Sequence, residues 1–213
     1  MLIHEGGPFI FRPMRKVLGE LPTFRQDEVR REPMVFAADF AGAIEMGGPI
    51  TVAFMRFLDP KKAWVIDSKT VMLMEGMYPC IPGWHHDDVP RNTPDGQPNY
   101  MNPDYLSSHV MAIVGEGSQT EYVDQEVTLP PVEGGRIIYQ VWDRVLDAMR
   151  PRVYTVPYRQ VLGFEWSDLH RGTKAVKNGW RFFIRASTNT RREVKNERRT
   201  QVQVYMDDAS RGW

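Results

Sequence analysis

The sequence is poor in cysteine and shows no excess of either charge. Its 213 residues include one cysteine, Cys80, so no disulfide can form within the chain. Nothing therefore points to an oxidising compartment. Lys+Arg and Asp+Glu both total 27, and the formal net charge is zero. This balance argues against a broad nucleic-acid footprint or an electrostatic membrane anchor. The local basic cluster at 191–200 is interspersed with glutamate, which is typical of a solvent-exposed connection between strands.

Long apolar runs are also missing. No stretch approaches the roughly 20 apolar residues that a membrane-spanning helix needs. The opening MLIHEGGPFIFRPMRK lacks the basic-then-apolar layout of a secretory signal. Hydrophobic residues make up 42% and charged residues 25%, as in ordinary globular domains. We expect a cytoplasmic protein with a single domain over 1–213, comprising an N-terminal arm and helices at 1–60 and a core at 61–213.

Helical patterns are confined to a few segments. Apolar residues recur at three- and four-residue spacing across 137–149, which predicts a helix that Pro151 ends. Residues 34–48 contain good helix formers and finish in Gly-Gly, a common helix stop. Residues 49–59 start with a proline suited to a first helical turn, and a strand is the alternative for this segment.

Most other apolar stretches have the length and composition of strands. They are rich in β-branched and aromatic residues, and they lie at 8–11, 63–67, 70–76, 108–117, 120–129, 152–158, 160–166, 178–187 and 200–206. The Pro-, Asn- and Gly-rich segment 88–106 is expected to be a loop. Because the strands do not alternate regularly with helices, we predict a mainly β (α+β) fold. It would be an antiparallel sandwich or barrel with helices outside.

Two of the five histidines lie together in GWHHDDVPR, at 83–91. Residues two apart on an extended strand point to the same side, so His85 with Asp87, or His86 with Asp88, could bind one metal ion. Two histidines and one carboxylate form the facial triad of non-haem iron enzymes, which leaves positions open for a cosubstrate and O₂. A polar turn after Pro-Gly is the alternative.

The second histidine of such a triad must come from elsewhere, either His109 or His170. His170 is followed by a short loop and then by a strand on which Arg181 and Arg185 share one face. Large apolar residues on both faces predict that this strand is buried, and a buried arginine is unfavourable unless it meets an anion. A small dicarboxylate would supply that anion in a bidentate grip. A structural ion pair with Asp or Glu is the alternative.

The string WH-x-D at 84–87, a distal histidine and an arginine eleven residues beyond it resemble the Fe(II)/2-oxoglutarate-dependent dioxygenases, particularly those akin to phytanoyl-CoA hydroxylase. The resemblance implies a double-stranded β-helix, also called a jelly roll or cupin-like fold. It implies that Fe(II), 2-oxoglutarate and O₂ are used to hydroxylate a small-molecule substrate, with release of succinate and CO₂.

The same resemblance implies roles for individual residues. Iron would be held by His85, Asp87 and His170, and the far carboxylate of 2-oxoglutarate would pair with Arg181. The resemblance also favours His85 and Asp87 over the shifted pair. Candidate substrate contacts are Arg185, His109 and Thr120, although His109 and Thr120 also suit purely structural roles. Two other readings stay open: a cupin-like metalloenzyme that uses no 2-oxoglutarate, and a jelly-roll binding or assembly protein without catalysis.

Overall fold

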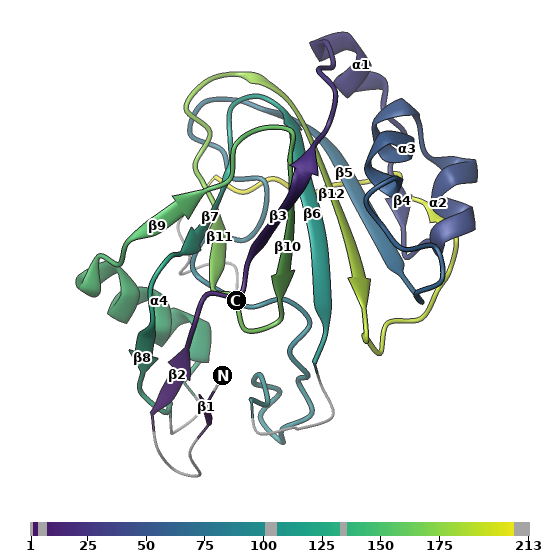
Figure 1. Cartoon of the computed structure of the whole chain (residues 1–213). Coiled ribbons are helices and arrows are strands. Elements are labelled where there is room, and N and C mark those ends of the chain that lie inside the picture. The colour runs from purple at the N-terminus through teal and green to yellow at the C-terminus, as the bar shows by residue number, and fades with distance from the viewer. Residues whose placement is uncertain (1, 4–7, 101–105, 133–135, 207–213) are drawn as a thin grey trace.

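The computed structural model describes residues 2–3, 8–100, 106–132 and 136–206. The fold is mainly β, with antiparallel sheets and a few helices (Figure 1). The helices are α1 (Gln26–Arg31), α2 (Phe40–Met46), α3 (Pro49–Met55) and α4 (Ile138–Met149). The strands are β1 (Leu2–Ile3), β2 (Phe9–Phe11), β3 (Lys16–Glu20), β4 (Val35–Phe36), β5 (Val65–Leu73), β6 (Ser108–Gly115), β7 (Thr120–Val123), β8 (Val127–Leu129), β9 (Val153–Thr155), β10 (Gln160–Glu165), β11 (His170–Gly172), β12 (Gly179–Thr188) and β13 (Glu197–Arg198).

The largest element is a five-stranded antiparallel sheet in the order β3-β10-β6-β12-β5. Strand β12 pairs with β5 on one side and with β6 on the other, so it is a central strand. Its side chains alternate between the two faces of the sheet, as the pleat requires. Phe182, Ile184 and Ala186 face the helices, whereas Arg181 and Phe183 face the other way.

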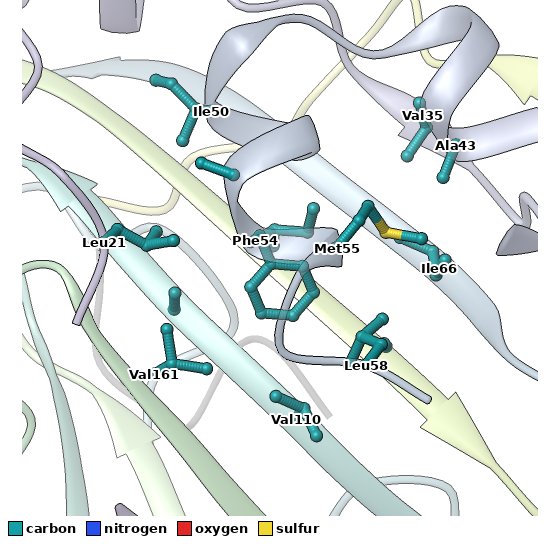
Figure 2. Packing of buried hydrophobic residues seen from close by; sticks show 14 of the residues in the cluster. Leu21, Val35, Ala43, Ile50, Phe54, Met55, Leu58, Ile66, Val110 and Val161 are labelled. Carbon is teal, nitrogen blue, oxygen red and sulfur yellow. The ribbon is translucent and has the colours of Figure 1, made fainter. Parts of the chain in front are cut away.

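Helices α1, α2 and α3 cover one face of this sheet (Figure 1). Figure 2 shows the core between the two layers, with Phe54 of α3 over the sheet and Ile66 and Val110 among its neighbours. Phe54 and Ile66 are fully buried. Apolar side chains fill the space between these helices and the sheet.

A buried carboxylate completes the start of α3. The N-cap residue of α3 is Gly48, which has no side chain to cap the helix. Glu32 takes over this role from outside the helix, and its carboxylate accepts hydrogen bonds from the amides of Gly48, Ile50 and Thr51 at 2.8–3.2 Å. A carboxylate at a helix N-terminus satisfies otherwise unpaired amides and complements the helix dipole. Glu32 thereby fixes the helical layer behind the sheet.

The opposite face of the sheet packs against a three-stranded sheet in the order β11-β7-β9. Met111, Leu162 and Phe164 of the large sheet and Tyr122 of the smaller one form the apolar layer between them. The turn after β6 therefore carries the chain from one sheet to the other, because β6 and β7 pair with different partners.

Helix α4 lies outside the smaller sheet and covers a cluster of aromatic residues. Its Trp142 packs against Phe11 and Tyr100, with ring centroids 5.4 and 5.0 Å apart. Trp84, immediately before the paired histidines, belongs to the same cluster and is 1% exposed. The cluster anchors the start of the segment that carries these histidines.

Several predictions from the sequence are confirmed. The mainly β, antiparallel character is confirmed, as are the strand at 178–187 and the helix at 137–149. The helical interpretation of 49–59 is correct, and the alternative of a strand is excluded. The described part of the loop 88–106 has no helix or strand, and residues 101–105 lie outside the described chain.

Other predictions need correction. Residues 34–48 begin with strand β4 before helix α2, and 63–67 and 70–76 belong to one strand, β5. The predicted strand at 200–206 is wrong, because only Tyr205 makes a bridge, to Tyr78.

Of the helices in the described ranges, α4 is the longest at 12 residues, and none has the length and apolarity to cross a bilayer. The single-domain division stays a prediction.

Candidate metal centre

Three predicted ligands converge in space. The side chains of His85, Asp87 and His170 each present one ligand atom, and these atoms lie within 4.8 Å of one another. The Nε2 atom of His170 lies 3.2 Å from Oδ2 of Asp87. Adjacent ligands of an octahedral ion at about 2.1 Å are separated by about 3 Å, so this spacing suits a metal site.

Backbone pairing brings the two halves of the centre together. The amide of His85 donates to the carbonyl of His170 at 2.9 Å, and the amide of His170 donates to the carbonyl of His85 at 3.0 Å. This antiparallel bridge places the two imidazoles on the same side, with ring centroids 4.6 Å apart. Asp87, two residues along, lies on that side as well. The His-x-Asp spacing thus becomes a three-residue site through one non-local bridge.

The hydrogen bonds of the two imidazoles prepare them for a cation. Nδ1 of His85 lies 2.9 Å from the carbonyl of Gly83, and Nδ1 of His170 lies 2.9 Å from the carbonyl of Asp168. A carbonyl only accepts, so each Nδ1 carries a proton, and Nε2 is the ring atom left to bind a metal ion. Burial, reinforced by His170, lowers the pKa of His85 to about 4, so its ring is neutral near pH 7.

Asp87 is held as a carboxylate. Burial opposes its ionisation, but the positive charge of Arg185 and the contact with His170 outweigh burial and keep the pKa of Asp87 well below its usual value. Arg185 forms an ion pair with Asp87 and lies 4.0 Å from Asp88. A carboxylate has two oxygens with several lone pairs, so Arg185 and a metal ion can share it.

The alternative register, His86 with Asp88, points elsewhere. The His86 ring is buried in the aromatic cluster, 4.5 Å from Phe11, and its Nδ1 contacts the hydroxyl of Tyr100 at 2.8 Å. Asp88 has a left-handed backbone with φ of 53°, which turns the chain away after Asp87. Among the described residues, the only group with metal-binding geometry is His85, Asp87 and His170.

The three ligands line a cavity of about 270 Å³ between the two sheets. Arg181 lines the same cavity and is 4% exposed. Its Nε donates to the carbonyl of Ser118 at 3.0 Å, and no carboxylate of the described chain lies within 4.0 Å of its guanidinium. Burial lowers the pKa of Arg181 to about 10, which still leaves it charged near neutral pH.

The three candidate substrate contacts occupy different places. Thr120 lines the cavity from β7, and Arg185 lines it while paired with Asp87. His109 does not line the cavity. Its two ring nitrogens lie 2.9 and 3.1 Å from the hydroxyls of Ser187 and Ser107, and its ring stacks on Phe164. The substrate-binding roles stay predictions, and for His109 the contacts favour a structural one.

Reasoning from the sequence missed two kinds of cavity residue. Asp67 and Lys69 lie in the middle of β5, where polar residues resembled a break between two strands. Arg192 and Arg199 come from the basic cluster interpreted as a solvated connection, yet both line the cavity and both pair with Asp67. The signal for β5 was its alternation, since Asp67 and Lys69 are two residues apart and share a face.

We expect the free energy of unfolding of His109→Gln to fall less steeply with decreasing pH than that of the wild type. Burial lowers the pKa of His109 to about 3, whereas an unfolded histidine titrates near 6.5. The unfolded chain therefore binds the proton more readily. The stability that the neutral ring contributes is full above pH 6.5 and is lost as pH falls toward 3. The variant should lower the slope of unfolding free energy against pH by about 1.4 kcal/mol per unit in this window.

Urea unfolding of metal-free protein at pH 5, 6 and 7 measures this slope. Phe164→Leu is the matched control, because it disturbs the ring stacked on His109 without removing a titrating group. It should destabilise the protein equally at each pH. Identical slopes for His109→Gln and the wild type would contradict a buried, neutral His109.

Comparisons with known proteins add little to this picture. No family model and no curated protein matches the chain. Among solved structures, the chain is similar to an oxidoreductase of the 2OG-Fe(II) oxygenase family from Burkholderia pseudomallei. The likeness covers 78% of this chain and 69% of the other, with a TM-score of 0.35 and 14% identity. The functional argument below rests on the site itself.

Proposed function

We propose that the protein is a non-haem Fe(II)- and 2-oxoglutarate-dependent oxygenase that hydroxylates a small molecule. One observation carries the proposal. A His-Asp-His group with metal-binding geometry and a buried arginine without a carboxylate partner in the described chain line the same cavity. The first suits a divalent cation, and the second suits an anion that binds beside it.

The donor set fits Fe(II). Two neutral imidazoles and one carboxylate are the ligands of the non-haem iron facial triad, which leaves the remaining positions open. The carbonyls of Gly83 and Asp168 orient the two imidazoles, and Arg185 orients the carboxylate. Such supporting hydrogen bonds typically accompany protein metal ligands.

Arg181 fits the far carboxylate of 2-oxoglutarate. A guanidinium can bind a carboxylate through two parallel hydrogen bonds, and burial strengthens such bonds. Without an anion, Arg181 leaves a charge buried in a mainly apolar wall, which costs free energy. The cavity volume of about 270 Å³ suits a five-carbon dicarboxylate with room beside it.

The strand order supports a jelly roll. In chain order, β5, β6, β10 and β12 belong to the large sheet. The bridge at His85 and strands β7, β9 and β11 form the facing layer, in the spatial order His85 segment, β11, β7, β9. The chain changes layer at every step except from β7 to β9. Apart from β3 at the edge of the large sheet, each layer has four members. Facing layers threaded in this manner are typical of jelly rolls, and they support the single-domain organisation of 1–213.

The residues of the site have distinct tasks in this proposal. Bound Fe(II) together with 2-oxoglutarate would supply the activation of O₂. His85, Asp87 and His170 hold the ion, and Arg181 fixes the orientation of the cosubstrate. Met111, Tyr122 and Phe164 form the apolar wall that limits water at the site.

Anaerobic titration of the protein with Fe(II) and 2-oxoglutarate tests the proposal. A visible charge-transfer band should appear when both are present, and on admission of O₂ succinate should form. Metal binding without the band would favour a metalloenzyme of the same fold that uses no 2-oxoglutarate. No metal binding at all would favour a binding or assembly protein.

A further inference from the structure

The cavity carries more positive than negative charge. Five cationic side chains line it, whereas Asp67 and Asp87 are its two lining carboxylates. The cations are Lys69, Arg181, Arg185, Arg192 and Arg199. Fe(II) and 2-oxoglutarate have opposite formal charges of two, so together they leave the excess unchanged. A desolvated cavity with such an excess attracts an anion beyond the cosubstrate.

Of the five cations, Lys69 and Arg181 take no part in the ion pairs of the described residues, and Arg181 is the proposed cosubstrate site. Asp87 pairs with Arg185, and Asp67 pairs with Arg192 and Arg199. No carboxylate of the described residues lies within 4.0 Å of the Lys69 amine. Burial lowers the pKa of Lys69, and the surrounding guanidiniums lower it further. Its surroundings therefore disfavour the ammonium until an anion approaches.

Lys69 and Arg199 lie where the cavity opens. Both also line a larger outer groove, whose walls include Ile81, Val89 and the segment 199–203. Nε of Arg199 donates to the carbonyl of Ser68 at 3.1 Å, which holds the guanidinium next to the strand that carries Lys69. Lys69 is opposite Phe183 in the register of β5 and β12, and Arg181 is opposite Val71. The opening and the proposed cosubstrate site are thus neighbouring, separate positions.

We propose that the substrate carries a carboxylate or phosphate group that binds between Lys69 and Arg199, at the junction of the cavity and the outer groove. The assignment rests on the proposed function, because it takes Arg181 to be occupied by the cosubstrate. Apolar parts of the substrate then contact Ile81 and Val89 in the groove, whereas its reacting carbon faces the metal centre.

Inorganic phosphate is a suitable probe for this site. The test uses metal-free protein that carries Arg181→Met, so that phosphate cannot bind at the proposed cosubstrate site. We expect phosphate, at constant ionic strength, to raise Tm in a saturable manner. Adding Lys69→Met should weaken the apparent phosphate affinity at least tenfold. Lys61→Met, which removes an exposed lysine, is the matched control and should leave the affinity unchanged.

Benzoate and neutral benzamide complete the test. A stronger response to benzoate than to phosphate indicates a carboxylate substrate, and the reverse order indicates a phosphorylated one. An equal response to benzamide, no response to either anion in the Arg181→Met protein, or an unchanged response after Lys69→Met would overturn the proposal. None of these measurements depends on Fe(II) or 2-oxoglutarate, so failure of the oxygenase proposal shows separately, as a missing charge-transfer band.

Discussion

Asp87→Ala is expected to weaken Fe(II) binding by at least about 100-fold and to abolish succinate formation. Asp87 is the one carboxylate in the candidate triad, and the pKa of its side chain is held well below the usual value. Its removal takes away the negative charge that binds the cation. It also leaves Arg185 beside the site without its ion-pair partner, so a cation entering the cavity meets added repulsion.

Asp88→Ala is the matched control for this change. Asp88 is adjacent in sequence and also lies near Arg185, but it is outside the metal-binding group. We expect it to leave Fe(II) affinity within about threefold, since it alters only the longer-range field. Equilibrium titration with Fe(II) under argon measures both variants.

A loss of folding must be separated from a loss of metal binding. Breaking a buried ion pair destabilises proteins by about 3–5 kcal/mol, so Asp87→Ala could act through stability. Asp87→Asn keeps the shape of the side chain and removes only its charge. It should retain the circular dichroism of the wild type and still bind Fe(II) poorly. Equal Fe(II) affinity for Asp87→Asn and the wild type would refute the assignment of Asp87 as a ligand.

Local periodicity was sufficient to predict the part of the site on β12. Alternation along 178–187 placed Arg181 and Arg185 on one face and Phe182 on the other, and the structure has the same arrangement. The period of two holds because β12 is paired on both sides and cannot twist out of register.

Periodicity alone could not choose between the two His-Asp registers, because a strand puts His85 and His86 on opposite sides. The preference for His85 and Asp87 came from the resemblance of the string WH-x-D, and the structure has the same pair in the metal-binding group. The environments of the two histidines differ through non-local contacts. His85 bridges to His170, 85 positions away, whereas His86 is surrounded by Phe11 and Tyr100. Only the folded chain brings these partners together.

Polar residues that line the cavity also obscured one strand in the sequence. The stretch Asp67 to Lys69 interrupts the apolar pattern of β5, so the sequence predicted two short strands where one strand of nine residues exists. The interruption arises because Asp67 and Lys69 line the cavity and do not pack in the core. Conflicts between local pattern and fold are expected at such sites. Residues 200–206 show the reverse case. Their sequence alternates as a strand would, but in the described chain Tyr205 alone bridges to a partner, Tyr78, so no strand forms.

Arg181→Met is expected to weaken 2-oxoglutarate binding by at least about 100-fold while leaving Fe(II) affinity within about twofold. A hydrogen bond to a charged group contributes about 1.5–3 kcal/mol, and a bidentate grip contains two of them. Each 1.4 kcal/mol corresponds to a factor of about ten in affinity. Arg181 does not belong to the metal-binding group, so the ion should bind as before.

The same substitution should make the free protein more stable. Arg181 is 4% exposed, and burial lowers its pKa to about 10, which means that the folded state disfavours the charged form. Replacing the guanidinium with an uncharged side chain of similar length should raise the free energy of unfolding by on the order of 2 kcal/mol. Urea unfolding without ligands measures this gain. Arg12→Met, at an exposed ion pair with Glu126, is the control and should change stability by less than about 1 kcal/mol.

The two results together separate a ligand-binding arginine from a structural one. An arginine that stabilises the fold through an internal ion pair becomes costly to remove, so its loss lowers stability. An arginine held ready for an external anion destabilises the free protein and stabilises only the complex. A less stable Arg181→Met that binds 2-oxoglutarate like the wild type would therefore place Arg181 in the first class. The cosubstrate assignment would then fail even if His85, Asp87 and His170 bind metal.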